Sequence, residues 1–297
     1  MQAELKQALS QAISECTGGD FQLKSTQAQG GGCIHQAWLV SDSRTSYFVK
    51  LNRATCLEMF EAEAAALREL GDTGAIQVPR PLTHGIAHGH SYLVLEALAF
   101  GSAKSGAWAT MGRQLARLHR KTAQHFGWHR DNHIGSTAQD NAWTDDWPSF
   151  FREKRLRPQF ELAGRRAYRL LHAEAVLEKV ESILANHRPA PSLLHGDLWS
   201  GNAGFLDDGS PVLFDPATYY GDRETDLAFT ELFGGFPPSF YEAYENEWPL
   251  SRGHEVRSKL YNLYHLLNHL NLFGAGYLGQ SEFCIEQVLR SDPGSHQ

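Results

Sequence analysis

The chain has 297 residues, of which 42% are hydrophobic and 21% are charged, with a formal net charge of -7. This composition indicates a globular protein of one large domain or two medium ones, and the lack of a basic stripe argues against a nucleic-acid partner. No hydrophobic signal segment, membrane-length apolar run or CxxC pair is present, so we expect a cytoplasmic protein without a membrane anchor, zinc site or disulfide framework.

The first hundred residues predict a small antiparallel sheet with one main helix. An amphipathic helix is expected over 1–16, followed by short alternating stretches that are typical of strands. A helix then ends at Gly71, and two more strands follow. The expected strands are 21–26, 36–40, 47–52, 78–87 and 91–98, and the main helix is 56–70.

After Gly101 the apolar residues recur at helical spacing, which predicts a larger and mostly helical part. The lobe boundary is placed near 97–105, giving a nucleotide-binding lobe over 1–98 and a catalytic lobe over 99–297. A short hairpin is expected around DDGS, and residues 291–297 are expected to form a frayed tail. Helices are predicted over 107–122, 150–171, 173–187 and 255–273.

A glycine-rich loop and a lysine follow one another in the strand-rich part. Gly31, Gly32 and Cys33 lie between two predicted strands, where backbone N–H groups can approach phosphates closely, although a plain hairpin turn would have the same composition. Lys50 ends the third strand and precedes a helix, as the strand lysine of protein kinases does. Its expected role is to hold nucleotide phosphates.

An acidic partner for Lys50 is expected on the main helix. At 100° per residue, Glu63 lies about 50° from the centre of the apolar face, whereas Glu61 lies about 110° away. An unpaired carboxylate beside a buried face is costly, so the helix geometry favours Glu63 as the partner of Lys50. The alternative is that Glu63 extends to water.

The stretch LLHGDLWSGN keeps the spacing of the kinase pattern H-R-D-L-x-x-x-N, with Gly196 in place of the arginine. Asp197 then takes the place of the base, Asn202 that of a metal ligand, and His195 orients the loop. Thirteen residues after Asn202, Asp215 follows an apolar strand, where kinases carry a second magnesium ligand. These features predict ATP-dependent phosphoryl transfer with Mg²⁺.

Several segments together resemble the fructosamine kinase (ketosamine-3-kinase) family. The motifs are GGCIHQAW, FVKLN with MFEAEAAAL, IGSTAQDNAWTDDWPSFF, LLHGDLWSGN and FDPATYYGDRETDLA, and they extend over nearly the whole chain. The resemblance implies a two-lobed, protein-kinase-like α+β fold and a phosphotransferase with an alcohol acceptor. The implied acceptor is the sugar 3-hydroxyl of a ketosamine, in deglycation.

The resemblance also implies roles for particular residues. The backbone from Glu96 through Ala97 to Leu98 binds adenine, and Trp199 lines the sugar site. Asp222 and Glu224 could meet a substrate hydroxyl or amine, with helix capping as the competing role for the acids in this segment. His195 is grouped with the substrate side.

Cys33 lies inside the phosphate loop near a cationic lysine, which would lower its pKa. We expect that its oxidation, or a disulfide between two chains, slows ATP binding. The expected state is a monomer, with a Cys33-linked dimer as the alternative. Two other functions stay open: an aminoglycoside- or choline-type kinase of the same fold, and a nucleotide-binding pseudokinase. The sequence leaves the sugar and the amine carrier of the ketosamine undetermined.

Overall fold

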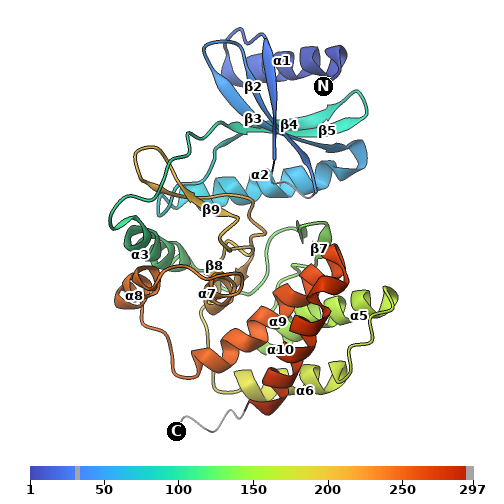
Figure 1. The fold of residues 1–297 in the computed structure, drawn as a ribbon, viewed down its shortest axis with the longest axis vertical. Helices are drawn as coiled ribbons and strands as arrows, with labels where there is room; N and C mark the ends of the chain where they lie inside the picture. The colour runs from blue at the N-terminus through green and yellow to red at the C-terminus, as the bar shows by residue number, and fades with distance from the viewer. Residues whose placement is uncertain (31–33, 292–297) are drawn as a thin grey trace. The chain divides into compact units, whose positions relative to one another are not determined.

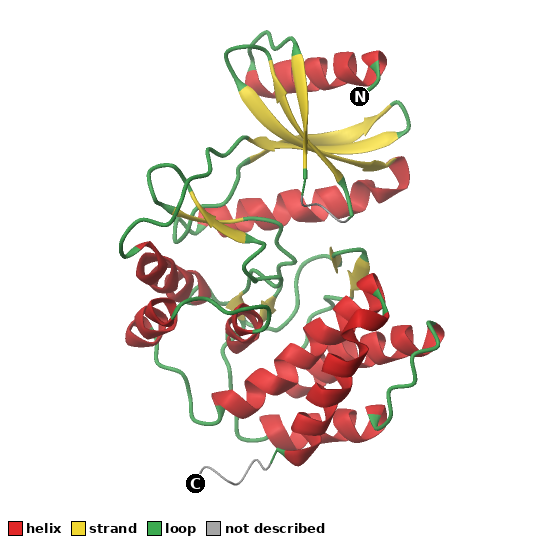
Figure 2. Ribbon diagram, in the orientation of Figure 1, coloured by secondary structure: helices red, strands yellow, loops and turns green. Residues whose placement is uncertain are grey.

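The computed structural model describes residues 1–30 and 34–291, and the chain divides into two compact units. One unit contains Met1–Lys104 and Gly204–Asp215, and the other contains Ser105–Ala203 and Pro216–Gln297. Strands predominate in the first unit and helices in the second (Figure 2). The segment 204–215 joins the first unit through backbone contacts, because Leu213 N–H donates to Gln77 O and Gln77 forms a parallel bridge with Val212. The division predicted between residues 98 and 99 stays a prediction.

The first unit contains the predicted five-stranded sheet, in the order β1-β2-β3-β5-β4 with every neighbouring pair antiparallel. The first strand begins later than the predicted 21–26, because Phe21 packs in the core beside the first helix and its N–H donates to Ser14 Oγ. The strands are β1 Ser25–Gln29, β2 Gln36–Ser41, β3 Ser46–Arg53, β4 Pro81–Ala87 and β5 His90–Glu96.

Two helices cover the sheet of the first unit, α1 (Ala3–Thr17) and α2 (Leu57–Asp72), and α2 follows a 3-10 turn, η1 (Ala54–Cys56) (Figure 1). The apolar side of α1 packs with Val49 of β3 in one core cluster. Successive strand residues point to opposite faces, so Lys50 points away from α1 and reaches α2. The predicted end of α2 at Gly71 is wrong, because the helix continues to Asp72.

The second unit is mostly helical, as predicted, but its boundaries differ. The single helix expected over 150–171 is divided by a π-helical turn, η2, and stops at Arg165, and left-handed residues Ala167 and His172 follow. The sequence analysis missed α8 and α10. The helices are α3 Ala107–His119, α4 Trp147–Phe151, η2 Arg152–Leu156, α5 Arg157–Arg165, α6 Ala173–Leu184, α7 Glu224–Glu231, α8 Pro238–Glu247, α9 His254–Phe273, η3 Ala275–Tyr277 and α10 Leu278–Arg290.

Short strand pairs complete the fold. β8 (Ser192–Leu193) pairs with β11 (Tyr220–Gly221), and β6 (Asn132–Ile134) pairs with β7 (Thr137–Gln139). The predicted hairpin around DDGS is formed by β9 (Ala203–Phe205) and β10 (Pro211–Leu213). The predicted frayed tail lies outside the described residues from 292 onward. Within the described ranges, no helix combines the length and the apolar character that crossing a bilayer requires.

Candidate active site

Lys50 of β3 forms two ion pairs within the first unit. Its Nζ lies 2.6 Å from Glu63 Oε1 on α2 and 2.5 Å from Asp215 Oδ1. The lysine is 5% exposed, and its burial on the α2 side of the sheet follows from the alternation along β3. The predicted pairing of Lys50 with Glu63 is therefore present in the structure. Its role in binding a nucleotide stays a prediction.

The charges around Lys50 favour its protonated form. Burial alone would lower the pKa of the ammonium group, but the nearby carboxylates of Asp215 and Glu63 outweigh burial and raise that pKa. Asp215 has a φ of 58°, in the left-handed region that side chains seldom adopt, and its side chain is 49% exposed. A strained, half-exposed carboxylate at the end of a buried strand is typical of a functional position.

The loop that carries Asp197 is held through its backbone. The buried carboxylate of Asp226, on α7, accepts hydrogen bonds from the N–H groups of His195 at 2.7 Å and Gly196 at 2.8 Å. His119 of α3 lies 3.1 Å from the same carboxylate. Burial raises the pKa of Asp226, but the hydrogen bond and charge of His119, the charge of His195 and the Gly196 N–H lower it further than burial raises it. Asp226 therefore stays ionised and fixes the loop.

Gly196 stands where the kinase pattern has an arginine, and the backbone geometry at this position explains the difference. Its φ is 82°, and a Cβ atom placed there would lie 2.1 Å from the carbonyl oxygen of Ala217. The two segments are held together because Ala217 N–H donates to His195 O at 2.9 Å. An arginine, or any other side chain, has no room at this turn. Glycine is the residue that lets the loop pass so close to residue 217.

Asp197 and Asn202 contact each other in the second unit. The amide nitrogen of Asn202 donates to the backbone oxygen of Asp197 at 2.8 Å and to its carboxylate Oδ2 at 2.9 Å. His195 is fully buried, and its Nδ1 accepts the Asp197 N–H at 3.3 Å. The ring of His195 is thus hydrogen-bonded to the loop backbone, and its predicted roles in orienting the loop and on the substrate side stay predictions.

Trp199 lies two residues beyond Asp197. Its ring passes so close to Gly201 that a Cβ atom on that glycine would lie 2.3 Å from it. The Trp199 ring also makes an edge contact with the ring of Phe233, with centroids 6.1 Å apart. Trp199 is only partly buried, so the ring presents a surface beside the Asp197 loop. This position is compatible with the predicted role at a sugar site.

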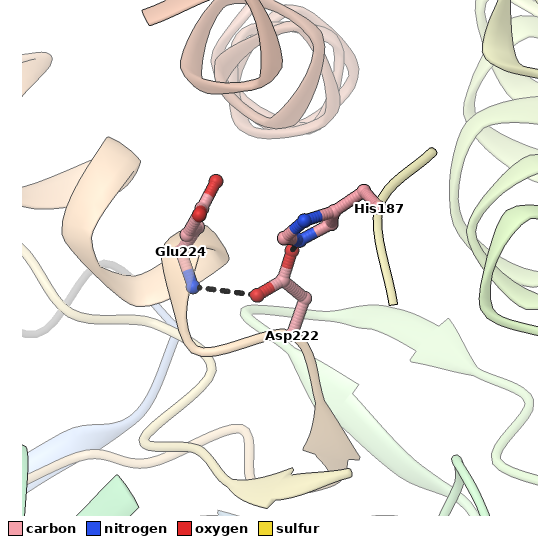
Figure 3. A group of neighbouring side chains, drawn as sticks. All are labelled: His187, Asp222 and Glu224. Atoms are coloured by element: carbon pink, nitrogen blue, oxygen red, sulfur yellow. Dashed lines mark hydrogen bonds and ion pairs between the residues drawn. The ribbon is translucent and has the colours of Figure 1, made fainter. Parts of the chain in front are cut away.

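Asp222 and Glu224 have partners within the protein (Figure 3). Asp222 Oδ2 lies 2.6 Å from His187 Nε2 and accepts the Tyr261 hydroxyl at 2.6 Å, and its Oδ1 accepts the Glu224 N–H. Both oxygens of Glu224 bind the guanidinium of Arg257, at 2.7 and 2.9 Å. These buried contacts favour the capping and structural roles over the contacts with substrate. A metal ion bound by His187, Asp222 and Glu224 would have to displace Arg257 from the Glu224 carboxylate.

A buried polar network, absent from the sequence predictions, supports the segment beside the Asp197 loop. Asn132 Nδ2 donates to Thr218 O at 2.7 Å, and Asn132 Oδ1 accepts from Gln139 and Asn141 at 2.9 Å each. Asn141 Oδ1 in turn accepts from Arg155 at 2.5 Å. Thr218 directly follows Ala217, the residue that lies against Gly196. The network therefore fixes the backbone segment that the Asp197 loop packs against. The available signal was a pair of asparagines nine residues apart, at either end of the β6–β7 hairpin.

The remaining predicted nucleotide contacts are the glycine-rich loop and the backbone after β5. Gly31, Gly32 and Cys33 lie outside the described residues, and so does the predicted redox role of Cys33. Glu96 ends β5, and its carboxylate accepts the Arg80 N–H at 2.8 Å. The backbone of Ala97 and Leu98 follows directly. Their contact with adenine stays a prediction.

Comparison with known proteins identifies the family. The fructosamine kinase family model matches residues 5–291. The chain belongs to the fructosamine kinase family. It is 50% identical over 286 residues to a probable ketoamine kinase of Synechocystis, covering 96% of this chain and 97% of that protein. It is 42% identical to a chloroplastic protein-ribulosamine 3-kinase of Arabidopsis thaliana, covering 92% of this chain and 85% of the relative.

Solved structures agree on the fold. A fructosamine-3-kinase candidate from Haemophilus somnus matches with a TM-score of 0.91 and 33% identity, covering 95% of this chain and 97% of that chain. An aminoglycoside phosphotransferase, solved with ADP and hygromycin B, matches with a TM-score of 0.64 and 15% identity, covering 98% of this chain and all of the other. The predicted protein-kinase-like α+β fold is confirmed, and so is the predicted family.

Proposed function

We propose that this protein transfers a phosphoryl group from ATP to the 3-hydroxyl of a ketosamine sugar. The family and the names of its relatives, which include ketoamine and ribulosamine 3-kinases, support this substrate. The observation that carries the proposal is the oriented carboxylate of Asp197, which is held by Asn202 on a loop anchored at Asp226. Phosphoryl transfer depends mostly on positioning and charge neutralisation, and this loop supplies positioning.

Each residue of the proposed machinery has a defined task. Asp197 accepts the proton of the attacking sugar hydroxyl, because Asn202 orients its carboxylate. Lys50, protonated and buried, binds phosphate oxygens. Trp199 binds the apolar face of the sugar. The adenine binds to the backbone of residues 96–98, and the cytoplasm is the proposed location.

Asn202 of the second unit and Asp215 of the first each offer an oxygen atom of the kind that Mg²⁺ binds. The amide nitrogen of Asn202 is used by Asp197, which leaves the amide oxygen as its ligand atom, and Asp215 offers a half-exposed carboxylate. Mg²⁺ prefers such oxygen ligands and, when bound, neutralises charge on the phosphates. Asn202 and Asp215 would hold it.

The test is ADP release with Mg-ATP and ribuloselysine, fructoselysine, kanamycin or choline as acceptor. We expect turnover on a ketosamine, loss of that turnover in Asp197→Asn, and a phosphorus NMR signal coupled to the proton on sugar carbon 3. Turnover on kanamycin or choline alone would contradict the ketosamine assignment and favour the aminoglycoside- or choline-type alternative. ATP binding without turnover on any acceptor would favour a pseudokinase.

A further inference from the structure

A groove in the second unit lies along α9, between the end of α7 and α10. It has a volume of about 670 Å³, which is the size of a site for a drug-sized ligand. Leu232 and Leu266 contribute apolar surface, and Phe283 of α10 is 63% exposed beside them. An exposed phenylalanine within a groove is a typical anchor for a partner.

The groove begins next to the aromatic side chains that adjoin the Asp197 loop. Leu232 precedes Phe233, whose ring contacts Trp199 at 6.1 Å and Tyr277 at 6.1 Å. Tyr277 is followed within two residues by Gly279, on the opposite wall of the groove. Phe233 and Tyr277 therefore adjoin groove residues in the sequence, and Phe233 contacts the ring of Trp199.

The charge of the groove points to a cationic ligand. Glu231 lies on the groove wall and accepts a hydrogen bond from Ser258 Oγ at 3.0 Å, and none of the ion pairs found among the described residues involves it. Glu255 of α9 also lines the groove; its carboxylate is 68% exposed and lies 4.0 Å from His254 Nε2. Lys259 is the one lysine or arginine among the described residues that line the groove. His254 also lines the groove, so two carboxylates face one lysine and one histidine, and this acidic balance beside apolar surface favours a positively charged partner.

We propose that this groove binds the peptide that carries a lysine-linked ketosamine, with Phe283 contacting an apolar residue and Glu231 pairing with a basic residue of that peptide. The proposal rests on the proposed function and names the amine carrier. Eight extended bonds separate the sugar C3 from the lysine Cα and extend about 10 Å, so the peptide backbone of such a substrate lies outside the sugar site.

The experiment compares three substrates with the same sugar: free ribuloselysine, a hexapeptide with ribuloselysine flanked by leucine and arginine, and the same peptide with glutamate in place of arginine. For the parent, we expect kcat/KM to be about tenfold higher on the arginine peptide than on the free adduct. Phe283→Ala should reduce that ratio about fivefold or more through KM. Glu231→Gln should abolish the preference for arginine over glutamate.

Leu171→Ala is the matched control, because Leu171 is also an exposed apolar residue of the second unit, at 72% exposure, and does not line the groove. Its ratio of peptide to free activity should equal that of the parent. Equal kcat/KM of the parent on the free adduct and on the peptides would contradict peptide binding at the groove but leave the proposed kinase function intact. The groove would also be overturned if Phe283→Ala lowered both activities alike. Absence of turnover on the free adduct and on both peptides would overturn the proposed function and the groove together.

Discussion

Replacing Gly196 by alanine tests how the Asp197 loop is positioned. The left-handed backbone costs alanine about 1–2 kcal/mol. The added Cβ atom would lie 2.1 Å from Ala217 O, so the two segments must move apart by about 1 Å, and such overpacking costs about 1–3 kcal/mol. Together these terms predict a loss of about 2–5 kcal/mol in the free energy of unfolding. They also predict a kcat that is lower by about 100-fold, since a 1 Å displacement of a catalytic group has that effect.

Gly106→Ala is the control for this substitution. Gly106 has a similar φ, 77°, but a Cβ atom there would meet nothing within 4 Å. It should lose only the backbone term of about 1–2 kcal/mol and keep its kcat. The free energy of unfolding is measured by urea denaturation, and kcat by ADP release. A Gly196→Ala variant that is no less stable than Gly106→Ala, with unchanged kcat, would refute the close contact with Ala217 as the reason for glycine.

Three further outcomes follow from the site. Glu63→Gln should lower kcat/KM for ATP about tenfold, because it removes one charged partner of Lys50. Glu58→Gln, on the exposed side of α2, should leave kcat/KM unchanged. Equal effects of the two substitutions would contradict the pairing of Lys50 with Glu63. The Asp226 carboxylate is buried, yet its histidine and N–H partners lower its pKa below the unfolded value of about 3.9. It therefore stabilises the fold above about pH 4, and the stability gap between the parent and Asp226→Asn, measured by urea denaturation, should narrow as the pH falls below that value. Trp199→Ala should raise KM for the ketosamine about tenfold and leave KM for ATP unchanged; a change in the KM for ATP alone would refute the sugar-side assignment.

The order of local features was predictable because each depends on neighbours in the sequence. Alternating apolar residues predicted the strands, and helical spacing predicted α2 and placed Glu63 toward the buried side. The spacing within HGDLWSGN, together with Asp215, led to the prediction that Asp197, Asn202 and Asp215 carry the chemistry. Alternation alone placed the start of the first strand too early, because Phe21 packs in the core beside α1 instead of extending the strand.

The supports of the site depended on tertiary structure, because they join residues far apart in the chain. Asp226 binds backbone N–H groups about thirty residues away in the sequence. Glu224, for which the sequence left a substrate contact and a capping role open, forms a buried ion pair with Arg257. No local pattern records such pairings, because burial of a polar group is tolerated only where a partner from another element is present. The sequence by itself therefore determined which residues could perform the chemistry. The tertiary structure decided which carboxylates are oriented at the proposed site and which are paired with buried cationic side chains.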